Sequence, residues 1–229
     1  LIPQTALMGM SKPMVFDGVD DKVSIASFQT FAGDVTISGW FKYNIFTTYA
    51  PASIAQEQGT TPFPFFRLES TTSIGFLWNS SGWQQTNVAH GMSTGKWYHI
   101  VGCVSGTTAT VYINGVLLAT GTGKTAPSGT ASDTMNIGFQ DQDDEYLAGE
   151  ANEISIWNTG FSLAEVQELF NDGVALDATT HSVHTSASTN LKGYWRNDGV
   201  SSWEDRSTDY DNDSASILGS PETFLLPLR

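Results

Sequence analysis

The chain has 229 residues, of which 24 are acidic and 10 basic, so its formal net charge is −14. Such a charge repels phosphate backbones and anionic lipid headgroups, which excludes nucleic acid and membrane surfaces as favoured partners. Only 15% of the residues are charged while 22 are glycine, a balance typical of short strands joined by polar turns. We therefore expect an all-β protein with one sizeable core.

A single cysteine, Cys103, excludes an internal disulfide framework and a cysteine metal site. It lies in the apolar run HIVGCV, which indicates a buried structural thiol. No run approaches the roughly 18 apolar residues that a membrane-spanning helix needs. The first ten residues lack the basic region of a signal peptide, so we expect no secretion signal there.

Strand patterns recur through the first part of the chain, each bounded by Gly, Asp, Ser or Pro. In VTISGWFKY the alternation places Val35 and Ile37 on one face and Thr36 and Ser38 on the other, which predicts a half-buried strand. The strands predicted in this part are MVF near 14, KVSI at 22–25, VTISGWFKY at 35–43, FFRLE at 65–69 and SIGFLWN at 73–79.

The clearest local structure is the stretch at 96–121. Asn114-Gly115 lies between two β-rich runs, and this pair favours the positive φ angles of a type I′ turn. We expect three antiparallel strands here, at about 97–105, 109–113 and 116–120.

The second part of the chain adds two strands and one helix. Strands at 134–139 and 149–158 would complete a two-sheet core. In SLAEVQELFNDG, Ser162 and Glu165 form a capping box, and Gly173 is placed to end the helix. The Ser/Thr/His-rich stretch at 177–190 is interpreted as an exposed linker or mobile loop.

Three segments, 16–25, 96–121 and 135–173, resemble in that order the concanavalin A-like laminin-G jelly-roll domain. The resemblance implies a two-sheet antiparallel jelly-roll sandwich, often with calcium at its rim, and usually a ligand-binding or adhesive role. The motifs FDGVDDKVSI, KWYHIVGCV and GEANEISIW carry the likeness.

The C-terminal segment beginning LKGYWRNDG resembles a family piece that ordinarily precedes the FDG motif. Either the domain is permuted, or a second repeat has been truncated. We favour permutation because sandwich termini tend to lie close together. The prediction is a single domain over 1–229, with its core at 14–173, a loop at 174–189 and a segment at 190–229 that completes the same sandwich.

Aspartates crowd the turn of the FDG motif, where Asp17, Asp20 and Asp21 fall within five residues. Carboxylates this close either repel one another or share a cation, and hard cations such as Ca²⁺ prefer oxygen ligands. The alternative is a turn with aspartate caps.

A second acidic loop, FQDQDDEY, resembles the calcium loop of pentraxins. The resemblance implies Asp141 and Asp143 as ligands, with Gln142 beside them. Asn152 stands where laminin-G relatives usually carry Asp, which implies a weaker site. Together these loops predict a weak structural Ca²⁺.

The sequence gives no support to catalysis. Related glucanases use a Glu-x-Asp-x-x-Glu strand, whereas an uninterrupted strand here sends Glu150 and Glu153 to opposite faces, with Asn152 at the central position. The histidines form no recognisable catalytic motif, and His181 and His184 fall in the loop interpreted as mobile. We therefore expect a protein that is not an enzyme.

Two tryptophans are candidates for ligand binding. Trp78 and Trp83 flank the polar loop WNSSGW, and flat aromatic faces beside amides suit sugar rings. The alternative for both is core packing, the usual use of large aromatic side chains.

The phrases YWRNDGVSSWED and GSPETFLLP resemble the ends of marine tailed-phage structural proteins. This likeness implies a structural or decoration protein on the capsid or tail of a virion, with other virion proteins and host-surface glycan as partners, and leaves a homo-oligomer open. A secreted extracellular carbohydrate-binding module is the alternative, with a glucanase-like hydrolase behind it.

Overall fold

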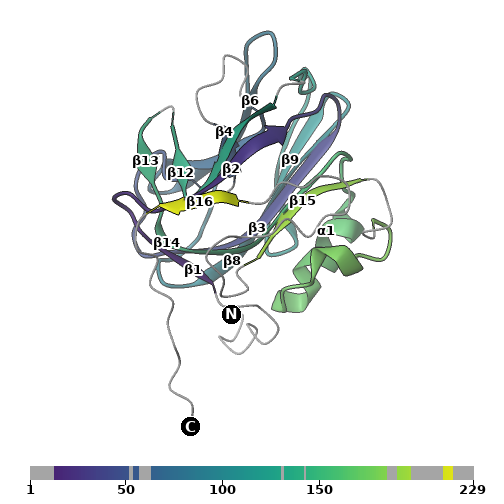
Figure 1. Cartoon of the computed structure of the whole chain (residues 1–229). Coiled ribbons are helices and arrows are strands. Elements are labelled where there is room, and N and C mark those ends of the chain that lie inside the picture. The colour runs from purple at the N-terminus through teal and green to yellow at the C-terminus, as the bar shows by residue number, and fades with distance from the viewer. Residues whose placement is uncertain are drawn as a thin grey trace.

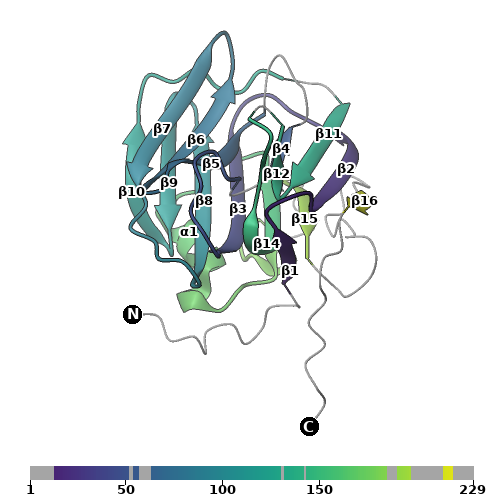
Figure 2. The same ribbon diagram turned by 90° about the vertical axis from the view of Figure 1, so that its left-hand side faces the viewer.

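The computed structural model describes residues 13–51, 54–56, 63–129, 132–141, 143–184, 190–196 and 214–218. In these ranges antiparallel strands form two facing layers, with one short α-helix outside them (Figures 1 and 2). The predicted all-β jelly-roll sandwich is confirmed. No helix in the described ranges is long and apolar enough to cross a membrane.

The larger layer is a seven-stranded sheet in the order β1-β14-β3-β8-β9-β10, with β15 also paired to β14. β1 pairs with 148–151 of β14 and β15 with 154–157, so these two strands share one edge of β14 end to end. The bounds are β1 Met14–Asp17, β3 Val35–Tyr43, β8 Trp97–Ser105, β9 Thr108–Ile113, β10 Val116–Gly121, β14 Ala148–Trp157 and β15 Leu191–Trp195.

The second layer consists of a four-stranded sheet, β16-β2-β11-β4, and a three-stranded sheet, β5-β6-β7, with β12 and β13 pairing as a separate ribbon. Their bounds are β2 Lys22–Gln29, β4 Ile54–Gln56, β5 Phe65–Ser70, β6 Ser73–Asn79, β7 Trp83–Ala89, β11 Ser132–Ile137, β12 Phe139–Gln140, β13 Glu145–Tyr146 and β16 Ser214–Leu218.

The main core lies between the layers and is rich in aromatic side chains. Phe66 and Phe76 stack at 4.7 Å between ring centroids, and the ring of Phe66 lies against Gly102 of β8, leaving no room for a side chain there. Trp195 of β15 belongs to the same core, so β15 contributes to the packing as well as to the sheet.

A second apolar cluster covers the other face of the large sheet. Helix α1 (Leu163–Phe170) and the 3₁₀ turns η2 (Asn171–Gly173) and η3 (Ala178–Thr180) belong to the segment that covers this face, which points away from the second layer (Figure 1). The prediction that 35–43 is half-buried is therefore wrong. Thr36 and Ser38 are buried because this segment lies over their face.

The helix begins as predicted and ends earlier. The Ser162 side chain accepts the Glu165 N–H while the Glu165 side chain accepts the Ser162 N–H, which confirms the capping box. The helix ends at Phe170, because Asn171 takes up a left-handed conformation with φ of 45°, rather than at Gly173.

The predicted hairpin is confirmed. Val116 pairs with Ile113, and the two residues between them, Asn114 and Gly115, have φ angles of 51° and 71°. These positive values are those of a type I′ turn.

Strands from the end of the chain pair with strands from its beginning. β15 extends the edge of β14 beyond β1, and β16 pairs with β2 at 22–25. The single domain over 1–229 stays a prediction, since 1–12, 197–213 and 219–229 lie outside the described residues.

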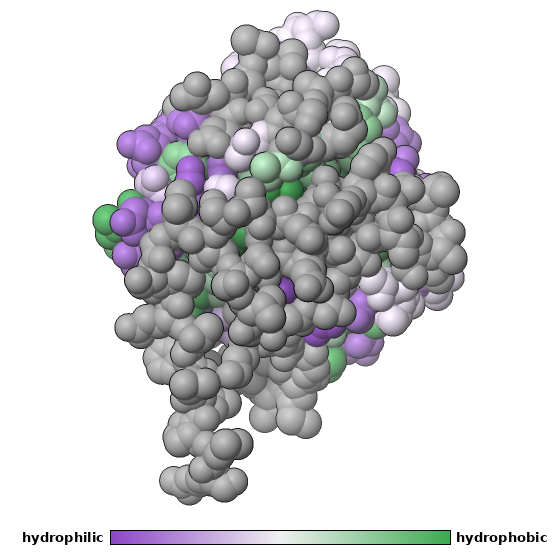
Figure 3. Space-filling model, in the orientation of Figure 1, coloured by the Kyte–Doolittle hydropathy of each residue, from purple (hydrophilic) through white to green (hydrophobic). Residues whose placement is uncertain are grey.

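Surface composition is mixed on the face drawn in Figure 3. Hydrophilic and hydrophobic residues are interspersed over the described part of that face. Among the described residues visible there, no broad apolar surface stands out.

Candidate functional site

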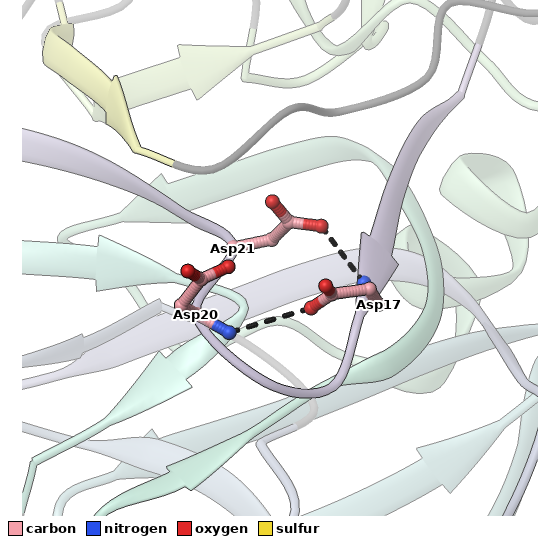
Figure 4. Close-up of side chains that lie close together, drawn as sticks. All are labelled: Asp17, Asp20 and Asp21. Atoms are coloured by element: carbon pink, nitrogen blue, oxygen red, sulfur yellow. Dashed lines mark hydrogen bonds between the residues drawn. The ribbon is translucent and has the colours of Figure 1, made fainter.

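The acidic turn between β1 and β2 brings three carboxylates together (Figure 4). Asp17 Oδ1 accepts the N–H groups of Val19 at 2.7 Å and Asp20 at 3.3 Å, while Asp21 Oδ2 accepts the Asp17 N–H at 2.9 Å. Gly18 allows the turn, with φ of 83° and its α-carbon against Ala148. Asp17 and Asp21 therefore serve as turn caps.

The same three side chains also fit a cation. One carboxylate oxygen of each of Asp17, Asp20 and Asp21 lies within 4.8 Å of the others. Two oxygens that each lie about 2.4 Å from a Ca²⁺ ion are at most about 4.8 Å apart, so the donor set matches calcium chemistry. Both interpretations of this turn are compatible with its geometry, and Ca²⁺ here stays a prediction.

The second acidic loop is engaged differently. Arg67 of β5 forms an ion pair with Asp143 and a second with Glu69 at 2.7 Å. Glu145 has its pKa raised by burial and by the charges of Asp143 and Asp144. The Arg67 guanidinium would compete with a metal ion for the Asp143 carboxylate. Within the described ranges, neither Asp143 nor Asp141 joins a three-ligand group; Gln142 lies outside those ranges.

Asn152 does not join the acidic turn. It is buried in β14 opposite Trp40, and its Oδ1 accepts the N–H of Glu153. Asp17 pairs with Ala148, four residues away, which at about 3.3 Å per residue places Asn152 about 13 Å along the strand. Asn152 therefore lies outside the group that Asp17, Asp20 and Asp21 form.

Glu150 and Glu153 lie on the same face of β14, contrary to the sequence prediction. A β-bulge between Asn152 and Ser155 inserts an extra residue, and Glu153 has φ of 54° within it. The bulge turns the Glu153 side chain to the face covered by α1.

Each of these carboxylates is held by partners within the fold. Glu150 pairs with Lys42, while Glu153 accepts the hydroxyl hydrogen bond of Tyr194 and pairs with Arg196 at 3.2 Å. Burial, reinforced by the negative charge of Glu153, raises the pKa of Tyr194. Glu153 is buried and ion-paired, so these two side chains are not arranged as an acid and base for glycoside hydrolysis.

Both histidines of the segment after the helix are buried, so the prediction of an exposed loop is wrong for His181 and His184, while Thr180, Ser182 and Val183 are exposed as predicted. His181 Nδ1 accepts two backbone N–H groups at 3.2 and 3.3 Å, and its Nε2 lies 3.2 Å from the Glu165 carbonyl oxygen. His184 Nε2 lies 2.8 Å from Glu165 Oε1. Both rings pack on Phe161 and Trp157, which is why the segment stays on the sheet.

Trp78 is part of the core. It is 0% exposed, and its indole N–H donates to the carbonyl of Thr125 at 2.8 Å. The prediction that Trp78 binds a ligand is wrong, because strand alternation turns its ring inward beside Phe76.

Trp83 has the opposite environment. It is 50% exposed and begins β7 (Trp83–Ala89), a strand that was not predicted from the sequence. Trp78 and Phe76 of β6 face the core opposite Gln84 and Thr86, so these two residues share the inward face of β7. Trp83, Gln85 and Asn87 therefore share its outward face.

These three residues, the β7 strip, are available to a ligand. Within the described part of the chain, no hydrogen bond, ion pair or ring contact engages the side chains of Trp83, Gln85 or Asn87. By contrast, the inward-facing Gln84 side chain is held by a hydrogen bond, because its Oε1 accepts the Thr125 N–H at 3.1 Å. The alternation of residues in WQQTNVA indicates which side chains share a face of β7. Gln85 and Asn87 were missed as candidates because β7 itself was not predicted.

The family model described as the concanavalin A-like lectin/glucanases superfamily matches residues 17–167. The chain belongs to this family. No curated protein matches its sequence. The chain nevertheless shares its fold with several solved structures.

A candidate carbohydrate-binding protein from Bacteroides ovatus has 14% identity and a TM-score of 0.64, over 92% of this chain and 59% of that one. Domain 4 of the Geobacillus stearothermophilus arabinanase AbnA, solved with arabinotriose, has 20% identity and a TM-score of 0.53, over 65% and 71%. Mouse laminin α1 domains LG4-5 have 11% identity and a TM-score of 0.52, over 64% and 41%. At these identities the likeness shows the fold.

Proposed function

We propose that this chain is a non-enzymatic carbohydrate-binding module that holds its ligand on the β7 strip. The observation that carries the proposal is the environment of Trp83. Its ring is half exposed in a regular strand, whereas Trp40, Trp78, Trp157 and Trp195 are buried. Exposing an aromatic ring to water is unfavourable in free energy, and binding a ligand over the ring removes that cost. The apolar C–H face of a sugar ring is suited to such contact.

The strip also supplies polar groups. Gln85 and Asn87 carry amides that both donate and accept hydrogen bonds, as sugar hydroxyls require. The Bacteroides and Geobacillus relatives, one a candidate carbohydrate-binding protein and the other crystallised with arabinotriose, support the same ligand class.

The test is affinity electrophoresis through gels that contain soluble polysaccharides. We expect at least one polysaccharide to retard the parent chain and Trp83→Ala to lose that retardation. Val116→Ala is the matched control, since Val116 is an exposed apolar side chain on β10. Retardation unchanged in Trp83→Ala would place the ligand elsewhere.

Calcium belongs to the proposal as a structural ion. Asp17, Asp20 and Asp21 would hold it, and the ion would supply positive charge that relieves repulsion among three carboxylates. The side chains of Asp17 and Asp21 also cap the turn, so the ion would rigidify a conformation that the hydrogen bonds already favour.

The place where the module works is proposed from its C-terminal phrases. We propose display on a phage capsid or tail, where the module would hold host-surface glycan, with an extracellular bacterial module as the alternative. Most of the residues behind this likeness lie outside the described ranges. Mass spectrometry of purified source particles tests the location: finding the chain in intact virions supports display, and finding it only in culture medium overturns it.

A further inference from the structure

We propose that the ligand is a neutral glycan, longer than one sugar ring, which lies along β7 from Trp83 to Asn87. The inference rests on the proposed function and specifies its ligand class and orientation. Three features of the structure carry it: the length of the strip, the absence of charged side chains within it, and its fixed backbone.

The strip is longer than a single sugar ring. Trp83 and Asn87 lie four residues apart on one face, a separation of about 13 Å along an extended strand. Gln85 lies between them. A ligand that covers the indole ring and also reaches the Asn87 amide must therefore extend along the strand.

No charged side chain belongs to the strip; of the two described cations near it, Arg67 is ion-paired and Lys124 is held at the strand edge by a backbone carbonyl. Lys124 Nζ donates to the Gln85 carbonyl oxygen at 2.6 Å, and Arg67 is paired with Glu69 and Asp143. The chain as a whole carries a formal charge of −14. A uronic or sulfated sugar would meet the net negative charge of the chain and Glu69 beside Gly75, with Lys124 as the one neighbouring described cation that is not ion-paired, so the surface favours neutral sugars.

The strip is rigid on both edges. β6 pairs with β7 along its whole length on one side. On the other side Lys124 and Thr125 bond to Gln85 and Gln84. Ligand binding then requires little ordering of the backbone, which favours affinity.

Gly75 of β6 leaves room beneath the far end of the strip. It lies opposite Asn87, and a β-carbon at position 75 would meet Asn87 Oδ1 at 2.5 Å and Glu69 Cγ at 2.9 Å. The Asn87 amide thus leans over Gly75. A side chain at position 75 would displace this amide without removing any polar group from the strip.

The experiment is a glycan array with neutral and acidic glycans, each as single sugars and as oligosaccharides, followed by titration calorimetry with the strongest oligosaccharide. We expect neutral oligosaccharides to bind and the corresponding monosaccharides to bind at least tenfold more weakly. Gln85→Ala with Asn87→Ala should weaken binding about tenfold per lost hydrogen bond. Gly75→Ala should weaken it through Asn87, while Asn158→Ala, an exposed amide on another segment, should bind as the parent does.

The outcomes separate this inference from the proposed function. Acidic glycans bound in a Trp83-dependent manner, or monosaccharides bound as tightly as oligosaccharides, would overturn the inference and leave carbohydrate binding in place. The same holds if the double amide variant binds neutral oligosaccharides as the parent does. A parent chain that binds no glycan on the array overturns the proposed function itself.

Discussion

The outward face of the large sheet and the outward side of β7 in the small sheet are built in opposite ways. On the large sheet, Ser38, Trp40 and His99 are buried because the helix segment covers them. On β7 of the small sheet, Trp83 is half exposed and Asn87 is exposed. Among the described residues, neither side chain makes a hydrogen bond, an ion pair or a ring contact. Aromatic and polar side chains therefore have a structural role on the first face and are available to a ligand on the second.

The difference shows why residue type alone is a weak guide to function. Trp157 and Trp83 are the same amino acid at outward-facing positions, yet Trp157 packs on Phe161 beneath two histidines. When a segment covers one face of a sheet, the side chains on that face pack in the core instead of binding a ligand. The variants below test whether the two faces differ as described.

The largest expected effect is on stability at the covered face. Trp157→Ala should lower the free energy of unfolding by about 3–5 kcal/mol, because it opens a cavity in a buried cluster. Trp83→Ala should change it by about 0.5 kcal/mol or less. Urea titration followed by circular dichroism measures both values. Equal losses would contradict the contrast between the faces.

The next effect concerns the buried ion pair. Arg196→Ala should cost about 3 kcal/mol, because it leaves the Glu153 charge buried without its cation. Lys42→Ala breaks the more exposed pair with Glu150 and should cost about 1 kcal/mol or less. Glu153→Gln added to Arg196→Ala should regain part of the loss. If the two single variants lose the same stability, burial is not what distinguishes these pairs.

A pH effect should follow from His99. Burial lowers its pKa from 6.5 to about 3, so the folded state holds a neutral ring that the unfolded state protonates below pH 6.5. The stability that neutral His99 contributes to the folded state is fully present above pH 6.5 and is lost as the pH falls towards 3. At pH 5 the loss is about 2 kcal/mol.

His99→Phe isolates this effect, since the other titrating groups remain in both proteins. We expect the variant to lose about 2 kcal/mol less than the parent between pH 7 and pH 5, measured by urea titration at each pH. Parallel pH profiles for the two proteins would show that His99 is protonated in the folded state.

The smallest expected effect is that of calcium. At five times the dissociation constant, an ion bound only to the folded state adds about 1 kcal/mol. We expect Ca²⁺ to raise the melting temperature of the parent relative to chelator, and Asp20→Ala to abolish the shift. Asp141→Ala should retain it, because Asp141 lies outside the three-carboxylate group. If Ca²⁺ does not change the melting temperature of the parent, the prediction of a structural calcium ion is wrong.

Local patterns in the sequence predicted much of the fold. The Asn114-Gly115 turn and the capping box at Ser162 depend on neighbouring residues alone, and both are confirmed. The bulge at Glu153 was missed because it needs a positive φ at a residue that seldom adopts one. The burial of His181 was missed because it depends on Phe161 and Trp157, which are distant enough in sequence to leave no periodic signal.

The candidate site was only partly visible in the sequence for the same reason. Trp78 and Trp83 look alike in WNSSGW, and only the pairing of β6 with β7 shows which ring faces the core. Gln85 and Asn87 have no motif and become a strip through that pairing. Asp20 and Asp21 were found because the turn that gathers them is local.

Hydroxyl-radical footprinting of the chain with and without a bound neutral oligosaccharide, read by mass spectrometry at each residue, tests the central claim most directly. The account predicts ligand protection centred on Trp83 and extending to the peptide with Asn87, with no change at Trp157 or His181. Protection at the helix-covered face or the acidic turn, with Trp83 oxidised equally in both samples, would contradict it.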